Sequence, residues 1–177
     1  DLVRSQTRFV LPTYPLLGLT TEWLRAPSTG SAALQLQASI GSPGRFDTGR
    51  VLAFQRLGGT LAAGGGQARF GEDWQAALQG LGWRDVPLAD AADARTVAGD
   101  AAYLAVARTD ANRRLQVNLL QSRATAESGD ASRATGLWAE AHWRVGQGEH
   151  DFGLLRLDPG LSWGPTPIAS DVQGVYW

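Results

Sequence analysis

The chain has 177 residues, a formal net charge of −1 and a hydrophobic fraction of 44%. It is long enough for one domain with a sizeable core, and its near-neutral charge, without any block of basic residues, argues against a nucleic-acid partner. Cysteine is absent, which excludes disulfides, thiolate metal sites and cysteine nucleophiles.

Methionine is also absent, so the chain does not begin at a translation start. We expect Asp1 to follow a removed signal peptide or a cut made in preparing a fragment. No stretch approaches the roughly 18 uninterrupted apolar residues of a membrane helix, because Gln, Arg or Gly interrupts the apolar runs.

Apolar and polar residues alternate along most of the chain, as they do in β-strands whose side chains point to two faces in turn. Helical periodicity is nearly absent, and residues 89–97, rich in Asp and Ala without an apolar stripe, are predicted to be a loop. About eight strands are predicted, with a ninth beginning near the C-terminus. They lie near residues 16–25, 32–40, 51–70 with a bend at Gly58-Gly59, 74–85, 99–108, 113–123, 136–145, 149–157 and 172–177.

Two kinds of connection separate these strands, and they alternate. Short polar turns lie at residues 26–30, 71–73, 109–112 and 146–148. Longer segments rich in Gly, Ala, Asp and Pro lie near residues 41–50, 86–98, 124–135 and 158–171. Successive short turns are roughly 36 to 44 residues apart, which fits two tilted strands of about 10 residues each and one long loop. This pattern is typical of antiparallel strands that run up and down between two different surfaces.

The alternation is compatible with two arrangements of the faces. In a soluble β-sandwich the apolar side chains point inward, whereas in an outer-membrane barrel they meet lipid and the polar ones line the lumen. Trp23, Phe70, Trp74 and Trp143 lie close to the short turns, like the aromatic girdle at a membrane interface. Many apolar positions hold Ala or Gly, which suits a lipid-facing wall better than a small, tightly packed core. We therefore predict a single all-β domain over residues 1–177, an antiparallel up-and-down barrel or a segment of one, with a soluble β-sandwich as the alternative.

Two hairpins resemble the periplasmic hairpins of bacterial outer-membrane β-barrel proteins, the class that includes porins. They are RFGEDW at residues 69–74 and RVGQG at residues 144–148, each with alternating flanks and an aromatic ring nearby. The stretch LGLTTEW at residues 17–23 resembles strand segments of fimbrial usher pores. Porins and ushers have more strands than this chain supplies, so the resemblance implies a barrel segment that is truncated at the C-terminus.

The same resemblance implies a location and a role. It places the chain in the outer membrane of a Gram-negative bacterium, with the lipid bilayer as its partner and a transport, export or structural role. A small solute or a secreted polypeptide would be the cargo. No enzyme activity, cofactor or metal is predicted.

The polar side chains of the strands are expected to line the interior of the barrel. The predicted interior residues are Gln35, Gln37, Gln67, Arg69, Gln75, Gln79, Gln116, Asn118, Glu140, His142 and Arg144. Arg113 and Arg114 flank a short turn and are expected to reach the membrane interface instead. Trp138 and the run Leu154-Leu155 do not follow the alternation.

One cluster carries residue types suited to acid–base or metal chemistry. It comprises His142 and His150 with Glu140, Glu149 and Asp151, and a His–carboxylate pair inside a barrel would suit a hydrolase. These polar residues surround a turn, however, and no nucleophile or metal motif accompanies them. The glycines at residues 64–66 lack the ending of a phosphate loop and are predicted to lie in a strand. A histidine-dependent hydrolase is therefore the least favoured hypothesis.

The soluble alternative predicts a different function. A β-sandwich binding module, with carbohydrate as its ligand class and a periplasmic or secreted location, would use aromatic rings near the long loops as stacking platforms. Trp83, Trp138 and Trp163 hold the matching positions.

Overall fold

The computed structural model describes residues 11, 13–26, 32–46, 54–87, 96–125, 131–168 and 170–177. Strands cover 81% of these residues, and none of them is helical. Accordingly, no helix in the described ranges is long and apolar enough to cross a membrane. The predicted all-β class and antiparallel pairing are confirmed.

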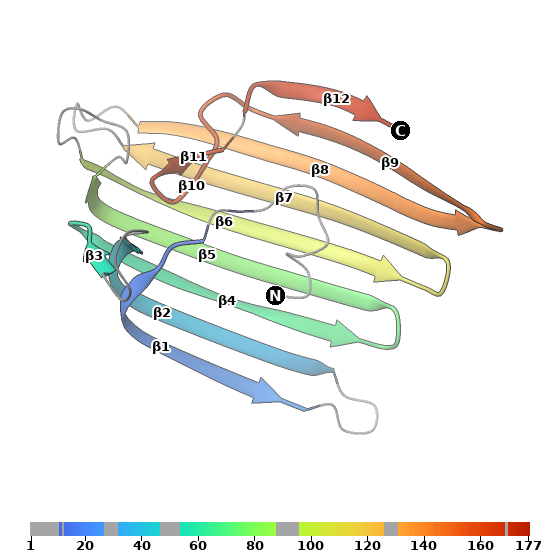
Figure 1. Cartoon of the computed structure of the whole chain (residues 1–177), viewed down its shortest axis with the longest axis horizontal. Coiled ribbons are helices and arrows are strands. Elements are labelled where there is room, and N and C mark those ends of the chain that lie inside the picture. The colour runs from blue at the N-terminus through green and yellow to red at the C-terminus, as the bar shows by residue number, and fades with distance from the viewer. Residues whose placement is uncertain are drawn as a thin grey trace.

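One large sheet contains most of the strands, which follow one another in chain order apart from a few short ones (Figure 1). Its order is β1 (Leu16–Arg25), β2 (Ala33–Phe46), β4 (Thr60–Phe70), β5 (Trp74–Pro87), β6 (Thr96–Thr109), β7 (Arg113–Thr125), β8 (Ala131–Val145), β9 (Gly148–Leu157) and β12 (Val172–Tyr176). The short strand β3 (Phe54–Arg56) pairs with the end of β2. β10 (Ser162–Trp163) and β11 (Thr166–Pro167) form a separate small hairpin.

The sheet is open in the part of the chain that the structure describes. β1 and β12 lie at its two ends and pair on one side only, with β2 and β9 respectively (Figure 1). Each therefore leaves one row of backbone N–H and C=O groups without a neighbouring strand in these ranges.

Most predicted strands are found, with longer ends than expected. β1 has the predicted bounds, whereas β2 and β8 extend into segments that were predicted to be loops. The predicted strand 51–70 is two strands, because the chain bends at Gly59, which has a φ of 84°. A Cβ at Gly59 would lie 2.5 Å from the carbonyl oxygen of Arg84. Residues 96 and 97 of the predicted loop belong to β6, and residues 88–95 lie outside the described residues.

Strand register assigns every side chain of the sheet to one of two faces, because directly paired residues of antiparallel strands share a face. The backbone N–H of Ser162 in β10 donates to the hydroxyl of Ser122 in β7 at 3.1 Å, so the small hairpin lies on the face of Ser122. We call this the inner face and the opposite one the outer face. One row of the inner face runs Gln37, Gly65, Gln79, Tyr103.

The hydrophobic core lies on the inner face, under the β10–β11 hairpin. The Tyr103 and Trp138 rings stack at 5.9 Å between centroids, and Trp163 of the hairpin meets Tyr103 edge-on at 6.4 Å. Further buried members of the core are Leu11, Leu61, Leu81, Trp83, Val86, Leu120, Leu157 and Leu161. The Tyr14 hydroxyl donates to the carbonyl of Trp163 and accepts from the backbone N–H of Thr166 at 3.2 Å, which ties the start of the chain to the hairpin.

Candidate functional site

Strand β7 shows most clearly how the two faces differ. On the outer face Leu115 and Val117 are each 52% exposed, whereas on the inner face Gln116 is 2% and Asn118 0% exposed. The amides are buried and the aliphatic residues are not. This is the reverse of a sheet that covers a soluble core with its apolar side.

The same exposed apolar surface continues across the outer face of the sheet. Exposed large apolar residues on this face include Leu17, Leu19, Trp23, Leu36, Ile40, Phe70, Trp74, Leu78, Leu104, Leu115, Val117, Leu119, Leu137, Val145, Phe152, Leu154 and Val175. Such a continuous patch exceeds what monomeric soluble proteins ordinarily leave in water.

Charged side chains on the outer face are confined to the strand ends. Arg25, Arg108 and Arg113 lie at the ends near the short turns. At the opposite ends are Arg84, Asp100, Arg123, Arg133 and Arg156, among which Asp100, Arg123 and Arg133 form one row across three strands. Between these margins, the described strands carry no charged residue on the outer face.

The four aromatic residues predicted to form a girdle all lie on the outer face, at the ends of strands near the short turns. Phe70 pairs directly with Trp74 across one such turn. The Arg108 guanidinium carbon lies 5.8 Å from the centre of the Trp74 ring, and Trp143 stacks on His150 at 5.9 Å. Trp23 is also on this face and is exposed.

All eleven residues predicted to line the interior share the inner face by register. Gln116 donates to Asn118 Oδ1 at 2.8 Å, and the Tyr103 hydroxyl donates to the same oxygen at 2.7 Å. Gln67 donates to Gln35, which in turn donates to Glu22. Hydrogen bonds between side chains therefore compensate the burial of Gln116 and Asn118.

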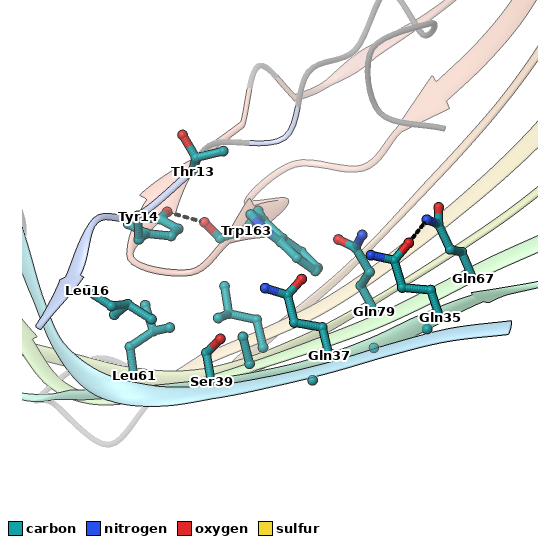
Figure 2. A pocket seen from close by; sticks show the side chains of 16 residues that line it. Thr13, Tyr14, Leu16, Gln35, Gln37, Ser39, Leu61, Gln67, Gln79 and Trp163 are labelled. Carbon is teal, nitrogen blue, oxygen red and sulfur yellow. Dashed lines mark hydrogen bonds between the residues drawn. The ribbon is translucent and has the colours of Figure 1, made fainter. Parts of the chain in front are cut away.

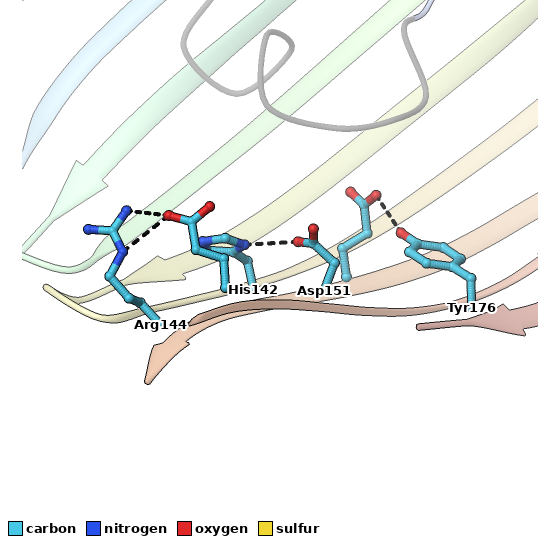
Figure 3. Close-up of polar contacts among 6 residues, drawn as sticks. His142, Arg144, Asp151 and Tyr176 are labelled. Atoms are coloured by element: carbon cyan, nitrogen blue, oxygen red, sulfur yellow. Dashed lines mark hydrogen bonds and ion pairs between the residues drawn. The ribbon is translucent and has the colours of Figure 1, made fainter. Parts of the chain in front are cut away.

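Charged residues continue the inner face toward the short-turn end of β8 and β9 (Figure 3). Arg144 donates to Glu149 from Nε at 3.1 Å and from Nη2 at 2.5 Å, and His142 Nδ1 lies 2.9 Å from Asp151 Oδ1. The Tyr176 hydroxyl of β12 donates to Glu140 at 2.8 Å. These pairs join three neighbouring strands on one face.

The structure corrects two interpretations of individual residues. Arg114 does not reach the outer margin as Arg113 does: it lies on the inner face, where its Nη2 donates to Gln116 at 2.7 Å. The predicted acid–base cluster is divided, because His142 is on the inner face and His150 on the outer. Among the described residues, no group of three His, Cys, Asp or Glu side chains is placed to hold a metal.

The tryptophans considered as sugar platforms are not exposed on the surface of the molecule, although Trp163 lines the cavity described below. Trp83, Trp138 and Trp163 are all buried in the core. The glycines at residues 64–66 lie within strand β4, as predicted, and form no phosphate loop.

A cavity of about 380 Å³ opens on the inner face between the sheet and the residues above it (Figure 2). Gln37, Gln79 and Ser39 project into it from strands β2 and β5, and Tyr14 and Trp163 lie opposite them. Sequence reasoning predicted the two glutamines as interior residues. It did not predict the segments that close over them.

Comparison with protein-family models, curated proteins and solved structures gives no match for this chain. Function is therefore inferred from the geometry of the two faces.

Proposed function

We propose that this sheet is the wall, or part of the wall, of a bacterial outer-membrane β-barrel with a transport, export or structural role and no catalytic activity. The outer face meets lipid, and the inner face borders an interior that the β10–β11 hairpin partly fills. The observation that carries the proposal is the reversal on β7, where the aliphatic residues are exposed and the amides between them are buried.

The height of the apolar band supports this proposal. On the outer face of β7 the charged margins are Arg113 and Arg123, ten positions apart. That separation is roughly 33 Å along a strand, and roughly 25 Å in height if the strand tilts by about 40°. An outer-membrane barrel has an apolar band about 25 Å tall, flanked by aromatic girdles.

A bilayer adds a requirement at the two edges of the sheet. Unpaired backbone groups cost several kcal/mol each in hydrocarbon, so β1 and β12 must pair there with each other or with further strands. Cysteines at Thr21 and Val175, on outer-face positions of the two edge strands, test this in membranes. A disulfide within one chain would mean closure by β1 and β12, and a disulfide between chains would mean pairing between copies.

Fractionation tests the proposal itself. The chain, fused to a cleavable secretion signal and expressed in a Gram-negative host, should sediment with outer membranes and require detergent for extraction. A fused soluble periplasmic enzyme, released by osmotic shock, serves as the control for leakage. Recovery of the chain in the periplasmic fraction without detergent would contradict the proposal.

The buried cluster on the inner face favours a second candidate, a water-soluble β-domain with a binding role. Leu61, Leu120, Trp138 and Leu161 pack together as the core of a soluble domain does. In that case another surface would have to cover the outer apolar band in water, and the fractionation experiment would place the chain in the periplasm.

A further inference from the structure

We propose that the cavity on the inner face binds a neutral polyhydroxylated solute, a sugar of one or two rings. This goes beyond the barrel proposal, since it concerns the inner face alone and requires neither a membrane nor transport. The polar lining of the cavity includes Tyr14, Gln35, Gln37, Ser39, Gln67 and Gln79.

The floor of the cavity is set by strand register. Gly65 of β4 pairs with Gln37 on one side and Gln79 on the other, so two amides flank a position without a side chain. A Cβ at Gly65 would lie 3.1 Å from Cγ of Gln79 and 2.6 Å from the backbone oxygen of Leu78. The glycine therefore allows β4 and β5 to approach closely, and no side chain stands between the two glutamines, which project to the same side (Figure 2).

Those two amides have hydrogen-bonding capacity to spare. Gln35 and Gln67 use their side chains in the chain of hydrogen bonds that reaches Glu22. Gln37 and Gln79, by contrast, have no side-chain hydrogen bond to any residue that the structure describes. A glutamine amide offers two N–H donors and a carbonyl with two lone pairs. Two such groups facing one space can each donate to and accept from adjacent hydroxyls.

The rest of the lining selects for a neutral ligand with an apolar face. None of the described residues that line the cavity is charged, so a phosphate or carboxylate there would lose its hydration without gaining a counter-charge. Leu61, Leu81 and the rings of Tyr14 and Trp163 supply apolar surface for the C–H groups of a sugar. The volume of about 380 Å³ is at the small end of the range for ligand pockets.

Binding of maltose and glucose to the purified chain, measured by calorimetry, tests the inference. We expect saturable binding of at least one of the two, and at least 10-fold weaker binding of glucose 6-phosphate. In the double variant Gln37→Leu/Gln79→Leu, the affinity for the sugar should fall at least 10-fold. The matched control, Gln121→Leu/Gln173→Leu, changes two exposed glutamines on the outer face and should bind as the parent does.

Three results would overturn the inference: no saturable binding of either sugar, equal affinity for glucose 6-phosphate, or unchanged affinity in the Gln37→Leu/Gln79→Leu variant. A circular-dichroism melt of each variant shows whether it is folded, and Gln79→Glu provides a second test should the double variant unfold. This substitution keeps the shape of the side chain, adds a charge and should also weaken binding.

The fractionation experiment is independent of sugar binding. Failure of sugar binding therefore leaves the membrane proposal standing, and failure of the membrane proposal leaves the sugar site standing.

Discussion

On the outer face of the sheet large apolar side chains are exposed, whereas on the inner face polar side chains are buried. Strand β7 carries both kinds on alternate residues. Val117 is half exposed, while its neighbour Asn118 is completely buried. Leaving large aliphatic side chains in water forgoes about 1.5–3 kcal/mol each relative to burial. Repeated over a whole face, that loss is large compared with the 5–15 kcal/mol by which proteins are ordinarily stable. The comparison therefore supports the proposal that lipid covers the outer face.

The inner face is itself divided along the strands. Toward the short turns it carries paired polar and charged side chains, such as His142 with Asp151 and Arg144 with Glu149. Toward the long connections it carries the core that packs beneath β10 and β11. The end toward the long connections is therefore closed over by side chains and a folded-in hairpin, and the other end presents a polar surface.

The largest expected effect comes from placing a charge in the middle of the outer band. Val117→Arg lies between the charged margins of β7. If the band lies in hydrocarbon, this change should destabilise the folded chain in lipid vesicles by about 2–4 kcal/mol, measured by urea unfolding. Gln121→Arg, near the long-loop margin of the same strand, is the matched control, with an expected cost of about 0–1 kcal/mol. Equal destabilisation by the two arginines would mean that the middle of the band and its margin are in the same environment.

The second expected effect concerns the buried amides of the inner face. Asn118→Ala removes the oxygen that accepts from both the Tyr103 hydroxyl and the Gln116 amide. We expect the free energy of unfolding to fall by about 1–3 kcal/mol, because buried donors lose their acceptor. Gln121→Ala, an exposed amide of the same strand, should change it by no more than about 0.5 kcal/mol. A cost for Asn118→Ala as small as that of the control would mean that the inner amides are solvated.

Alternation with a period of two predicted both the strands and the sorting of their faces. The predicted interior residues Gln116 and Glu140 pair directly across β7 and β8, and the predicted girdle residues Phe70 and Trp74 pair across β4 and β5. Such a pattern is local, because each strand records its own two faces in its own sequence. The sequence of a strand does not show which of its two faces is buried, so the exposed fractions of the side chains in the structure were needed to decide this.

Long-range packing and register could not be predicted in the same way. Trp138 lies among polar neighbours on the inner parity because it packs under Leu161 and Trp163, from a segment predicted to be a loop. The two histidines separate because the turn at Gly146 pairs Val145 with Gly148, which places His142 opposite Asp151 and not opposite His150. A slip of one residue would have changed the face of every later side chain.

A third test sharpens the comparison at the edge of the sheet. The Tyr176 hydroxyl donates to Glu140 (Figure 3). A Cβ at Gly153 would overlap the Tyr176 ring. Gly153→Ala should therefore displace β12 and cost about 1–3 kcal/mol. Gly174→Ala, in β12 itself, meets no atom within 4 Å and serves as the control. Hydrogen exchange of the β12 amides should accelerate in the first variant only, and equal protection in both would contradict the packing of Tyr176 over Gly153.

The smallest expected effect is a dependence on pH at the closed end of the inner face. Burial raises the pKa of Tyr14, and hydrogen bonds from Thr166 oppose the shift only in part. An acid whose pKa is higher in the folded state loses stability as the pH rises, here above about pH 10, where the unfolded chain ionises first. The β10–β11 hairpin should then detach, and the fluorescence of the buried tryptophans should change.

Tyr14→Phe cannot ionise at this position, and its lost hydrogen bonds should cost about 0.5–1.5 kcal/mol at neutral pH. Its change in fluorescence between pH 9 and 11 should be smaller than that of the parent, because the phenol of Tyr14 is absent. A transition in the variant as steep as in the parent would place the titrating group elsewhere.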